Sequence, residues 1–388
     1  MHVVVAHSED VETVAAMDEV LERARAGVRP ELGPPRAALL FATSGYELEG
    51  LVEAAHGAFP ELPLLGCTVE GISSSALGYH EDSVALVLLC GERLRAVGGV
   101  ARELSRDPRG PLAAVTEAAR AATLELAEAP ALCLAFSESL TVSGAEVLSG
   151  LEAGTGGSTP VLGGTSTDDL RFVRAHQFYG GDVLNDASPF LLLGGALDAG
   201  WCADSGWYPV GIEGRVSEVT GPRVHRIGDE TALAFYQRYL GAKLRPSSDN
   251  PLAVYATAGG DGQFFLRAPL AVDEATGAIT FLGPIPEGTS VRITETCRDD
   301  LLSAARRAAE RAREGLRHPP RAALFFSCAS RKHQLGTRAA LELDMLHSVA
   351  GGCPTFGVYT YGEFGSLTPQ GPTRFLNQSI VALLLGGA

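Results

Sequence analysis

Four side chains able to bind or attack a small molecule stand where apolar runs stop near the C-terminus. Cys328 and Arg331 follow one such run, while Glu363 and Asn377 stand between the next two. Because open α/β sheets bind ligands where their strands end, we expect these residues to share a site. A carboxylate can hold an ammonium group, and an arginine can grip a carboxylate with two parallel hydrogen bonds. Glu363 and Arg331 therefore predict a site for the zwitterion of an amino acid, unless the two side chains simply bridge each other.

The cysteines offer a second chemistry. Cys328 is close in sequence to Arg331 and His333, which would stabilise a thiolate, and Cys67 directly follows Gly66, where a ligand can approach closely. A cysteine-dependent enzyme is therefore one alternative, although a nucleophile also needs an oriented base. The other alternative is that both are inert buried thiols. The seven cysteines are scattered without a CxxC pair, which indicates reduced thiols and a cytoplasmic protein.

Other polar groups at strand ends allow more than one interpretation. Asp168 and Asp169 follow the sequence GGTST. Paired carboxylates can transfer protons or hold a cation, or they can cap a turn. Asn377 can bond a ligand or fix the loop after Glu363. The sequence contains no P-loop, HExxH or GxSxG motif, and no GxGxxG between a strand and a helix, so it names no standard enzyme.

These groups belong to a strand-helix-strand-strand unit that occurs more than once. The segments PLLGCT, PVLGGT and PTFGVYT begin at Pro63, Pro160 and Pro354 and match one another, and so do ALLFATS, LCLAFSES and ALFFSCAS upstream of them. An apolar strand, a Pro-led strand and a returning strand follow one another in the same order each time, which favours an internal repeat over a chance likeness of apolar strands. The strands do not alternate apolar with polar residues, which predicts sheets covered by helices on both faces.

The predicted fold is α/β, with two domains built from repeated strand-helix-strand-strand units and largely buried mixed sheets. Residues 1–200 hold two units, and residues 201–388 hold one clear unit and a divergent one. A segment rich in Gly, Trp and Pro over 201–221 marks the boundary. Beyond it we expect a hairpin over 215–227, a helix over 229–240, and strands at 252–256, 264–272, 278–282 and 291–296.

The composition is that of a globular, acidic protein. The chain is 46% hydrophobic and 20% charged, with a formal net charge of −15. The densest basic stretch, Arg306–Arg313, falls between apolar positions at helical spacing and is typical of a solvated helix face. No apolar run reaches the length of a membrane span, and the N-terminus lacks the basic start of a signal peptide. We therefore expect a cytoplasmic protein that binds neither nucleic acid nor membranes.

Several segments resemble the N- and C-terminal FIST domains of bacterial sensory proteins. They are the Gly66–Thr68 strand end, LGGTSTDD, the segment from Val219 to Ala232, FFSCASR, YTYGEF and the pair Asn377-Gln378. The resemblance covers nearly the whole chain, and YGE followed by NQ is its most specific part. Two positions depart from the family pattern. Glu70 stands in GCTVEGI where the family more often has GE after the strand, which weakens an acidic ligand role, and Leu376 stands where a histidine often precedes the Asn.

The resemblance implies a cytoplasmic sensory module that binds a small ligand, such as an amino acid or a derivative, and signals through a partner protein such as a histidine kinase. We expect the site where strand ends of the first and third units meet the C-terminal hairpin. Its ligand-binding residues would be Cys67, Thr68, Cys328, Arg331, Tyr361, Glu363 and Asn377. No catalytic residue, metal ion or cofactor is expected.

A haem-based gas sensor is the alternative that the resemblance adds, because some family members are described as nitric oxide sensors. His176 and His225 are the candidate haem ligands, since both stand in strand-like, partly apolar segments. Either histidine can instead be an exposed or hydrogen-bonded structural residue.

Overall fold

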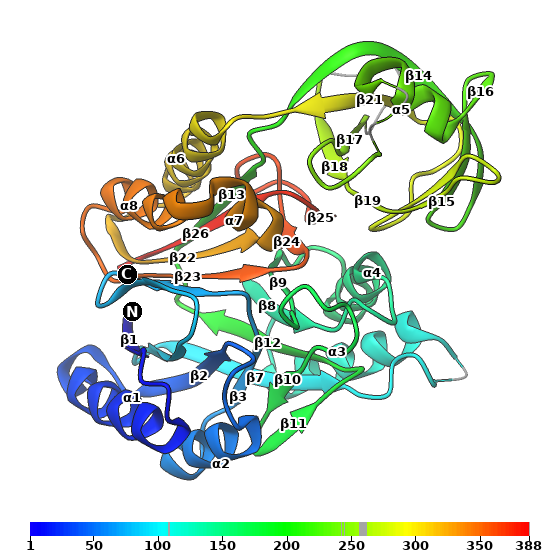
Figure 1. Ribbon diagram of the computed structural model, residues 1–388. Helices are drawn as coiled ribbons and strands as arrows, with labels where there is room; N and C mark the ends of the chain where they lie inside the picture. The colour runs from blue at the N-terminus through cyan, green and yellow to red at the C-terminus, as the bar shows by residue number, and fades with distance from the viewer. Residues whose placement is uncertain (108, 242, 244, 256–261, 388) are drawn as a thin grey trace.

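Three α/β units and a β-rich insert make up the computed structural model, which describes residues 1–107, 109–241, 243, 245–255 and 262–387 (Figure 1). The first unit consists of β1 (His2–Ser8), α1 (Thr13–Gly27), β2 (Pro35–Ala42), α2 (Leu48–Ala58), β3 (Leu64–Thr68), β4 (Ile72–Ser74), β5 (Gly78–His80) and β6 (Val84–Cys90). The second consists of β7 (Leu94–Ala101), α3 (Pro111–Leu126), β8 (Leu132–Ser137), α4 (Gly144–Thr155), β9 (Val161–Thr165), β10 (Gln177–Tyr179), β11 (Asp182–Leu184) and β12 (Ser188–Gly195). The third consists of β13 (Ala199–Asp204), α6 (Arg298–Glu314), β22 (Pro320–Cys328), α7 (Ala329–Leu335), α8 (Ala340–Val349), β23 (Thr355–Thr360), β24 (Glu363–Gly365), β25 (Arg374–Leu376) and β26 (Ile380–Gly386).

The sheets of the three units share one strand order. They run β1-β6-β2-β3, β7-β12-β8-β9 and β13-β26-β22-β23. In each sheet the last two of these strands are parallel, and the remaining pairs are antiparallel. A parallel pair needs a crossover, and a helix supplies it in every unit. The predicted α/β fold of repeated units with mixed sheets is therefore confirmed, and each unit also has a leading strand and a hairpin.

Each unit lends its hairpin to the sheet of another unit. Strand β4 of the first unit pairs with β23 of the third, β10 of the second pairs with β3 of the first, and β24 of the third pairs with β9 of the second. The exchange is cyclic, so every unit both gives and receives a hairpin. Backbone hydrogen bonds cover the strand edge that would otherwise be open in each sheet. The three units are consequently bound into one ring rather than joined as beads on a string.

The inner faces of the three sheets meet in a shared core. Equivalent phenylalanines from the units, Phe41, Phe136 and Phe326, are fully buried there. The rings of Phe41 and Phe136 lie 4.9 Å apart edge to face, and those of Phe136 and Phe326 lie 5.8 Å apart. Burying a ring of this size contributes roughly 1.5–3 kcal/mol each. Helices pack on the outer faces in separate clusters, which explains why the strands show no polar alternation.

The insert lies between β13 and α6 and forms a curled antiparallel sheet with its own core (Figure 1). Its elements are β14 (Tyr208–Thr220), β15 (Arg223–Ile227), β16 (Glu230–Thr231), α5 (Ala232–Leu240), β17 (Leu252–Tyr255), β18 (Phe264–Arg267), β19 (Pro269–Asp273), β20 (Ala278–Phe281) and β21 (Ser290–Glu295). Gly221 makes the β14–β15 turn with φ +58°, and the Thr231 hydroxyl caps α5 by accepting from the Ala234 amide. The predicted hairpin, the helix and three of the four strands are found, although Ala256 lies outside the described residues. The strand predicted over 264–272 is instead divided into β18 and β19, which pair with different strands. The topology differs from the repeated unit, because the strand pairs described here are all antiparallel.

No helix within the described residues has the length and apolar character needed to cross a membrane.

Candidate functional site

A cavity of about 560 Å³ opens where the second unit, the third unit and the insert meet. We name it the α4 cavity, because the N-terminal turn of α4 forms one wall. The strand ends of the third unit form a second wall, and the β20 end of the insert forms a third. Its lining is mainly apolar, with Leu140, Val142, Leu170, Phe172, Leu270, Phe281, Leu282 and Phe375 among the lining residues. Enclosed apolar walls with a few polar groups are typical of small-molecule sites.

The wall at α4 is shaped by two local features. Ser143 caps the helix, since its hydroxyl accepts a hydrogen bond from the Ala145 amide at 3.3 Å. Gly144 follows, and a side chain there would collide with the ring of Phe375. The helix therefore begins in direct contact with β25. Glu146 in the first turn is the one charged residue among those that line the cavity in the described chain.

The structure brings three of the predicted ligand-binding residues, Cys328, Tyr361 and Asn377, to this cavity. Asn377 is only 2% exposed. Its Nδ2 donates to the Leu376 carbonyl at 3.1 Å, while its Oδ1 has no hydrogen-bond partner among the described residues. A buried acceptor left without a donor costs roughly 1–3 kcal/mol. A residue of the cavity lining thus has a hydrogen-bond acceptor without a partner among the described residues.

Tyr361 holds the loop that closes one side of the cavity. Its hydroxyl donates to Asp168 Oδ1 at 2.7 Å and accepts from the Leu170 amide at 2.7 Å, and its ring stacks on Phe172 with centroids 4.8 Å apart. Asp168 accepts three further bonds from the amides of residues 172–174. Burial raises the pKa of Asp168, but the bonds from Tyr361 and these amides outweigh it and hold the pKa below its usual value. Asp168 is therefore an anchored turn residue, which is the second of the two roles considered above.

Cys328 lines the cavity as a thiol. Its Sγ donates to the Tyr361 carbonyl at 3.7 Å. Burial, followed by the nearby Glu363, raises the pKa of this thiol well above its ordinary value. A thiolate is the form that attacks substrates, so the surroundings of Cys328 disfavour nucleophilic chemistry.

Glu363 lies behind the cavity wall and is fully buried. Its Oε2 accepts from the amide and the hydroxyl of Ser379 at 3.3 and 2.8 Å, and Thr360 Oγ1 lies 3.3 Å from its Oε1. Burial raises the pKa of Glu363 to about 8 despite these bonds. The side chain is consequently an uncharged acid near neutral pH and lies outside the cavity lining.

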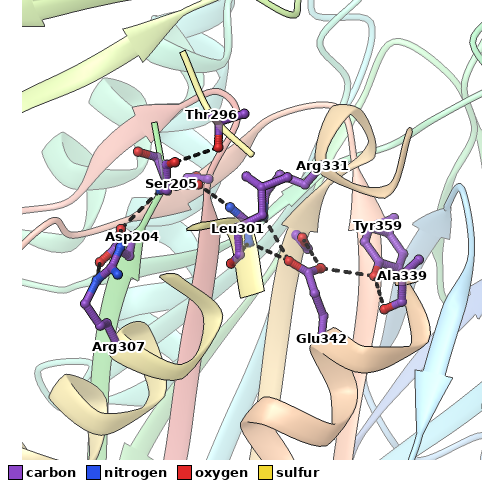
Figure 2. A network of polar contacts seen from close by, with 12 residues as sticks. Asp204, Ser205, Thr296, Leu301, Arg307, Arg331, Ala339, Glu342 and Tyr359 are labelled. Carbon is purple, nitrogen blue, oxygen red and sulfur yellow. Dashed lines mark hydrogen bonds and ion pairs between the residues drawn. The ribbon is translucent and has the colours of Figure 1, made fainter. Parts of the chain in front are cut away.

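Arg331 is not among the residues that line the cavity and lies in a buried polar network (Figure 2). Its guanidinium pairs with Glu342, with Nε 3.1 Å from Oε1, and also donates to the carbonyls of Ser205 and Leu301. Glu342 in turn accepts from Tyr359 at 3.0 Å. The bridge expected as the alternative for Arg331 therefore forms with Glu342 on α8, and Glu363 takes no part in it.

Cys67 and Thr68 of the first unit lie outside the α4 cavity. Cys67 is fully buried in the shared core, and burial raises the pKa of its thiol. The Thr68 hydroxyl donates to the Thr167 carbonyl at 2.6 Å and accepts from the His176 amide at 3.1 Å. Both side chains thus help to join the first unit to the second.

The two candidate haem ligands, His176 and His225, lie in separate parts of the molecule and outside the lining of the α4 cavity. His176 borders a separate cavity of about 670 Å³ whose lining includes Glu47, Glu49, Arg171 and Arg174. Burial, together with Arg174, lowers the pKa of His176. His225 lies on β15 of the insert, with Nε2 3.1 Å from Thr220 Oγ1. The haem alternative stays a prediction for both histidines. Within the described residues there is also no group of three or more His, Cys, Asp or Glu side chains placed to hold a metal ion.

Sequence reasoning missed two of the cavity walls. The first is the N-terminal turn of α4, although Ser143 followed by Glu146 is a recognisable helix start. The second is the insert, which contributes Leu270 and the end of β20. No local signal shows that either segment faces the third unit, because both contacts depend on tertiary packing.

Residues 36–230 match the FIST N domain, and residues 232–366 match the FIST C domain. The chain belongs to the FIST family. FIST domains are described as sensory domains that bind small ligands. The suspected resemblance is confirmed.

Matches between this FIST protein and individual relatives are more distant. An uncharacterised protein of Methanocaldococcus jannaschii is 36% identical over 81 residues, which are 21% of this chain and 15% of that protein. An uncharacterised protein of Mycobacterium tuberculosis is 27% identical over 224 residues, which are 53% of this chain and 56% of that protein. The matched region therefore spans about half the length of the mycobacterial relative.

Solved structures overlap the FIST chain only loosely. A cyanuric acid hydrolase from A. caulinodans covers 100% of this chain and 99% of its own, with a TM-score of 0.39 and 10% identity. A chorismatase covers 93% and 96%, with a TM-score of 0.33 and 9% identity. Overlap of this quality carries no conclusion about activity.

Proposed function

We propose that this FIST protein is a sensory module whose ligand binds in the α4 cavity. The ligand is an amino-acid derivative with an apolar side chain and an amine, and with its carboxylate removed or masked. The observation that carries this proposal is the Oδ1 of Asn377, a buried acceptor that has no hydrogen-bond partner among the described residues and belongs to the lining of a mainly apolar cavity.

Cavity chemistry supports an amine-bearing ligand over an acid. Asn377 Oδ1 is an acceptor that an N–H group of the ligand can satisfy, and the Glu146 carboxylate stabilises a positively charged amine. The apolar side chains suit the body of the ligand, and about 560 Å³ falls in the usual range for small-molecule pockets, on the order of 300–1,000 Å³.

The cavity suits the zwitterion of a free amino acid less well. Its carboxylate needs a cation, yet no lysine or arginine is among the described residues that line the cavity. Arg331, the candidate for this role, is outside the cavity lining and is held by Glu342 and by the carbonyls of Ser205 and Leu301. Leaving a carboxylate unpaired in an apolar site is costly, so the proposal is for derivatives in which that charge is absent.

The parts of the chain that line the cavity indicate how ligand binding could be passed to a partner protein. The cavity lies between the ring of units and the insert, so an occupant contacts both. It also contacts Phe172, which is stacked on Tyr361 and 46% exposed. Ligand binding would therefore favour one placement of the insert and of this loop, and a partner such as a histidine kinase would recognise that state.

A matched panel of ligands tests the proposal. Phenylalanine, phenylalanine amide, 2-phenylethylamine and 3-phenylpropanoate share a phenyl ring. Phenylalanine has an amine and a carboxylate, its amide has the amine and a neutral carboxamide, 2-phenylethylamine has the amine alone, and 3-phenylpropanoate has the carboxylate alone. Thermal unfolding should shift upward with the amide and the amine, because binding to the native state alone adds to stability. Glu146→Gln should reduce the shift. A shift with 3-phenylpropanoate alone would contradict the proposed charge preference, and no shift with any of a wide panel of apolar amines would contradict the site.

A further inference from the structure

We propose that Arg267 and Arg374 form a second binding site, for a small oxyanion such as a carboxylate or phosphate group, where the insert meets the C-terminal hairpin. Arg267 ends β18 of the insert, and Arg374 begins β25 of the hairpin. This inference is independent of the ligand proposed for the α4 cavity.

Arg267 is a buried charge without an acid. It is 5% exposed and donates to the carbonyls of Leu266, Phe375 and Pro284 at 3.0, 3.1 and 3.3 Å. Carbonyl groups satisfy hydrogen-bond geometry but bring no negative charge. Arginine is seldom this buried unless it is paired. In the described part of the chain no carboxylate forms an ion pair with it.

Arg331, which is also deeply buried, is paired with an acid. Arg331 is fully buried and pairs with Glu342, which is also fully buried. The same fold thus supplies a counter-charge to one buried guanidinium. At Arg267 it supplies a second arginine instead.

Arg267 and Arg374 share the ring of Phe265. Their guanidinium carbons lie 4.5 and 5.7 Å from its centroid. Arg374, like Arg267, forms no ion pair among the described residues. Burial and then the like charge of Arg374 lower the pKa of Arg267 to about 9. A bound anion would offset both effects on the guanidinium charge, and Arg374 can present its planar guanidinium fork to a carboxylate or a phosphate. Arg374 is partly exposed, which gives the anion access from solvent.

An anion at this point would also reach the ligand cavity indirectly. The Arg267 bond to the Phe375 carbonyl crosses from the insert to the hairpin, and Phe375 lines the cavity. Gly283, another lining residue, leaves no room for a side chain, because a Cβ there would lie 2.9 Å from Arg267 Nε. Fixing Arg267 therefore fixes two walls of the cavity.

Calorimetric titration of the ligand-free chain tests the oxyanion site. Sodium phosphate and sodium acetate are compared with sodium chloride at matched ionic strength. We expect saturable binding of phosphate, acetate or both, at least tenfold weaker in Arg374→Gln and weaker in Arg267→Lys, which keeps the charge but loses the guanidinium that the three carbonyls hold in place. Arg120→Gln, an exposed arginine on α3, should bind like wild type. Preference for phosphate or for acetate identifies the anion class, and either outcome supports the site. The proposal would be overturned if sodium chloride gave the same heats as phosphate and acetate, or if Arg374→Gln bound the anions as tightly as wild type. Because Arg374 is partly exposed, its variant remains a valid test even if Arg267→Lys fails to fold.

Discussion

Gln177 and Glu363 occupy equivalent positions in two of the exchanged hairpins and make the same bond. Gln177 Oε1 accepts from the Ala187 amide at 3.2 Å, and Glu363 Oε2 accepts from the Ser379 amide at 3.3 Å. Both side chains tie the start of a hairpin to the start of the returning strand. A neutral amide does this in the second unit, and an acid with a raised pKa does it in the third.

Glu363→Gln should therefore keep the fold and change its response to pH. Glu363 has a pKa of about 8 in the folded chain and an ordinary value near 4.5 when unfolded. Its contribution to stability is fully present below the unfolded value and is lost as pH rises toward about 8. The wild-type free energy of unfolding should fall across this window by an amount on the order of a few kcal/mol. The amide variant should lack that fall in urea titrations between pH 5 and 8, and an identical pH profile would contradict the buried-acid interpretation.

Arg331→Ala should destabilise the chain by about 3–5 kcal/mol, because it leaves the Glu342 carboxylate buried and unpaired. Urea denaturation measures the loss. Arg307→Ala is the control, since Arg307 pairs with Asp204 in a more exposed position and should cost about 1 kcal/mol or less (Figure 2). Equal costs for the two variants would show that Arg331 is not held as described.

Tyr361→Phe should loosen the loop at the cavity while leaving the stacked ring in place. The variant loses the bonds to Asp168 and to the Leu170 amide, and the expected cost is about 1–3 kcal/mol. Hydrogen exchange should quicken at residues 170–174 and stay unchanged at the shared core. Tyr208→Phe, at an exposed tyrosine of the insert, is the control. Unchanged exchange in the loop would refute the anchoring role of Tyr361.

Thiol labelling distinguishes a sensor from a cysteine enzyme. With iodoacetamide near pH 8 the exposed Cys297 should react first. Cys328 and Cys67 should stay unlabelled until the chain unfolds, because both are buried thiols with raised pKa values. Mass spectrometry of the labelled peptides reports the order. Selective labelling of Cys328 in the folded chain would support the enzymatic alternative instead.

The repeat was predictable because its signal is local. Pro-led strands ending in glycine and threonine, such as the one from Pro63 to Thr68, recur with the same neighbours. The exchange of hairpins was not predictable, because β4 pairs with a strand of the third unit far along the chain. Pairing of that kind depends on how the units pack, and hairpins with three residues in each strand leave little sequence pattern.

The site was predictable in part for the same reason. Cys328, Tyr361 and Asn377 reach the cavity because strand ends gather at one edge of a sheet. Arg331 could not be placed from sequence, since its direction is decided by Glu342 on a later helix. The protonation state of Glu363 could not be predicted from the sequence either, because its raised pKa depends on complete burial in the folded chain.

We propose above that an amine-bearing ligand donates a hydrogen bond to Asn377 in the α4 cavity. Calorimetric titration of 2-phenylethylamine into wild type, Asn377→Leu and Asn185→Leu tests it most directly. Asn185 occupies the equivalent place after β11 but is exposed, so it is a matched control. We expect Asn377→Leu to weaken binding about tenfold or more, equivalent to about 1.4 kcal/mol, and Asn185→Leu to leave it unchanged. Equal affinity in all three proteins would contradict it.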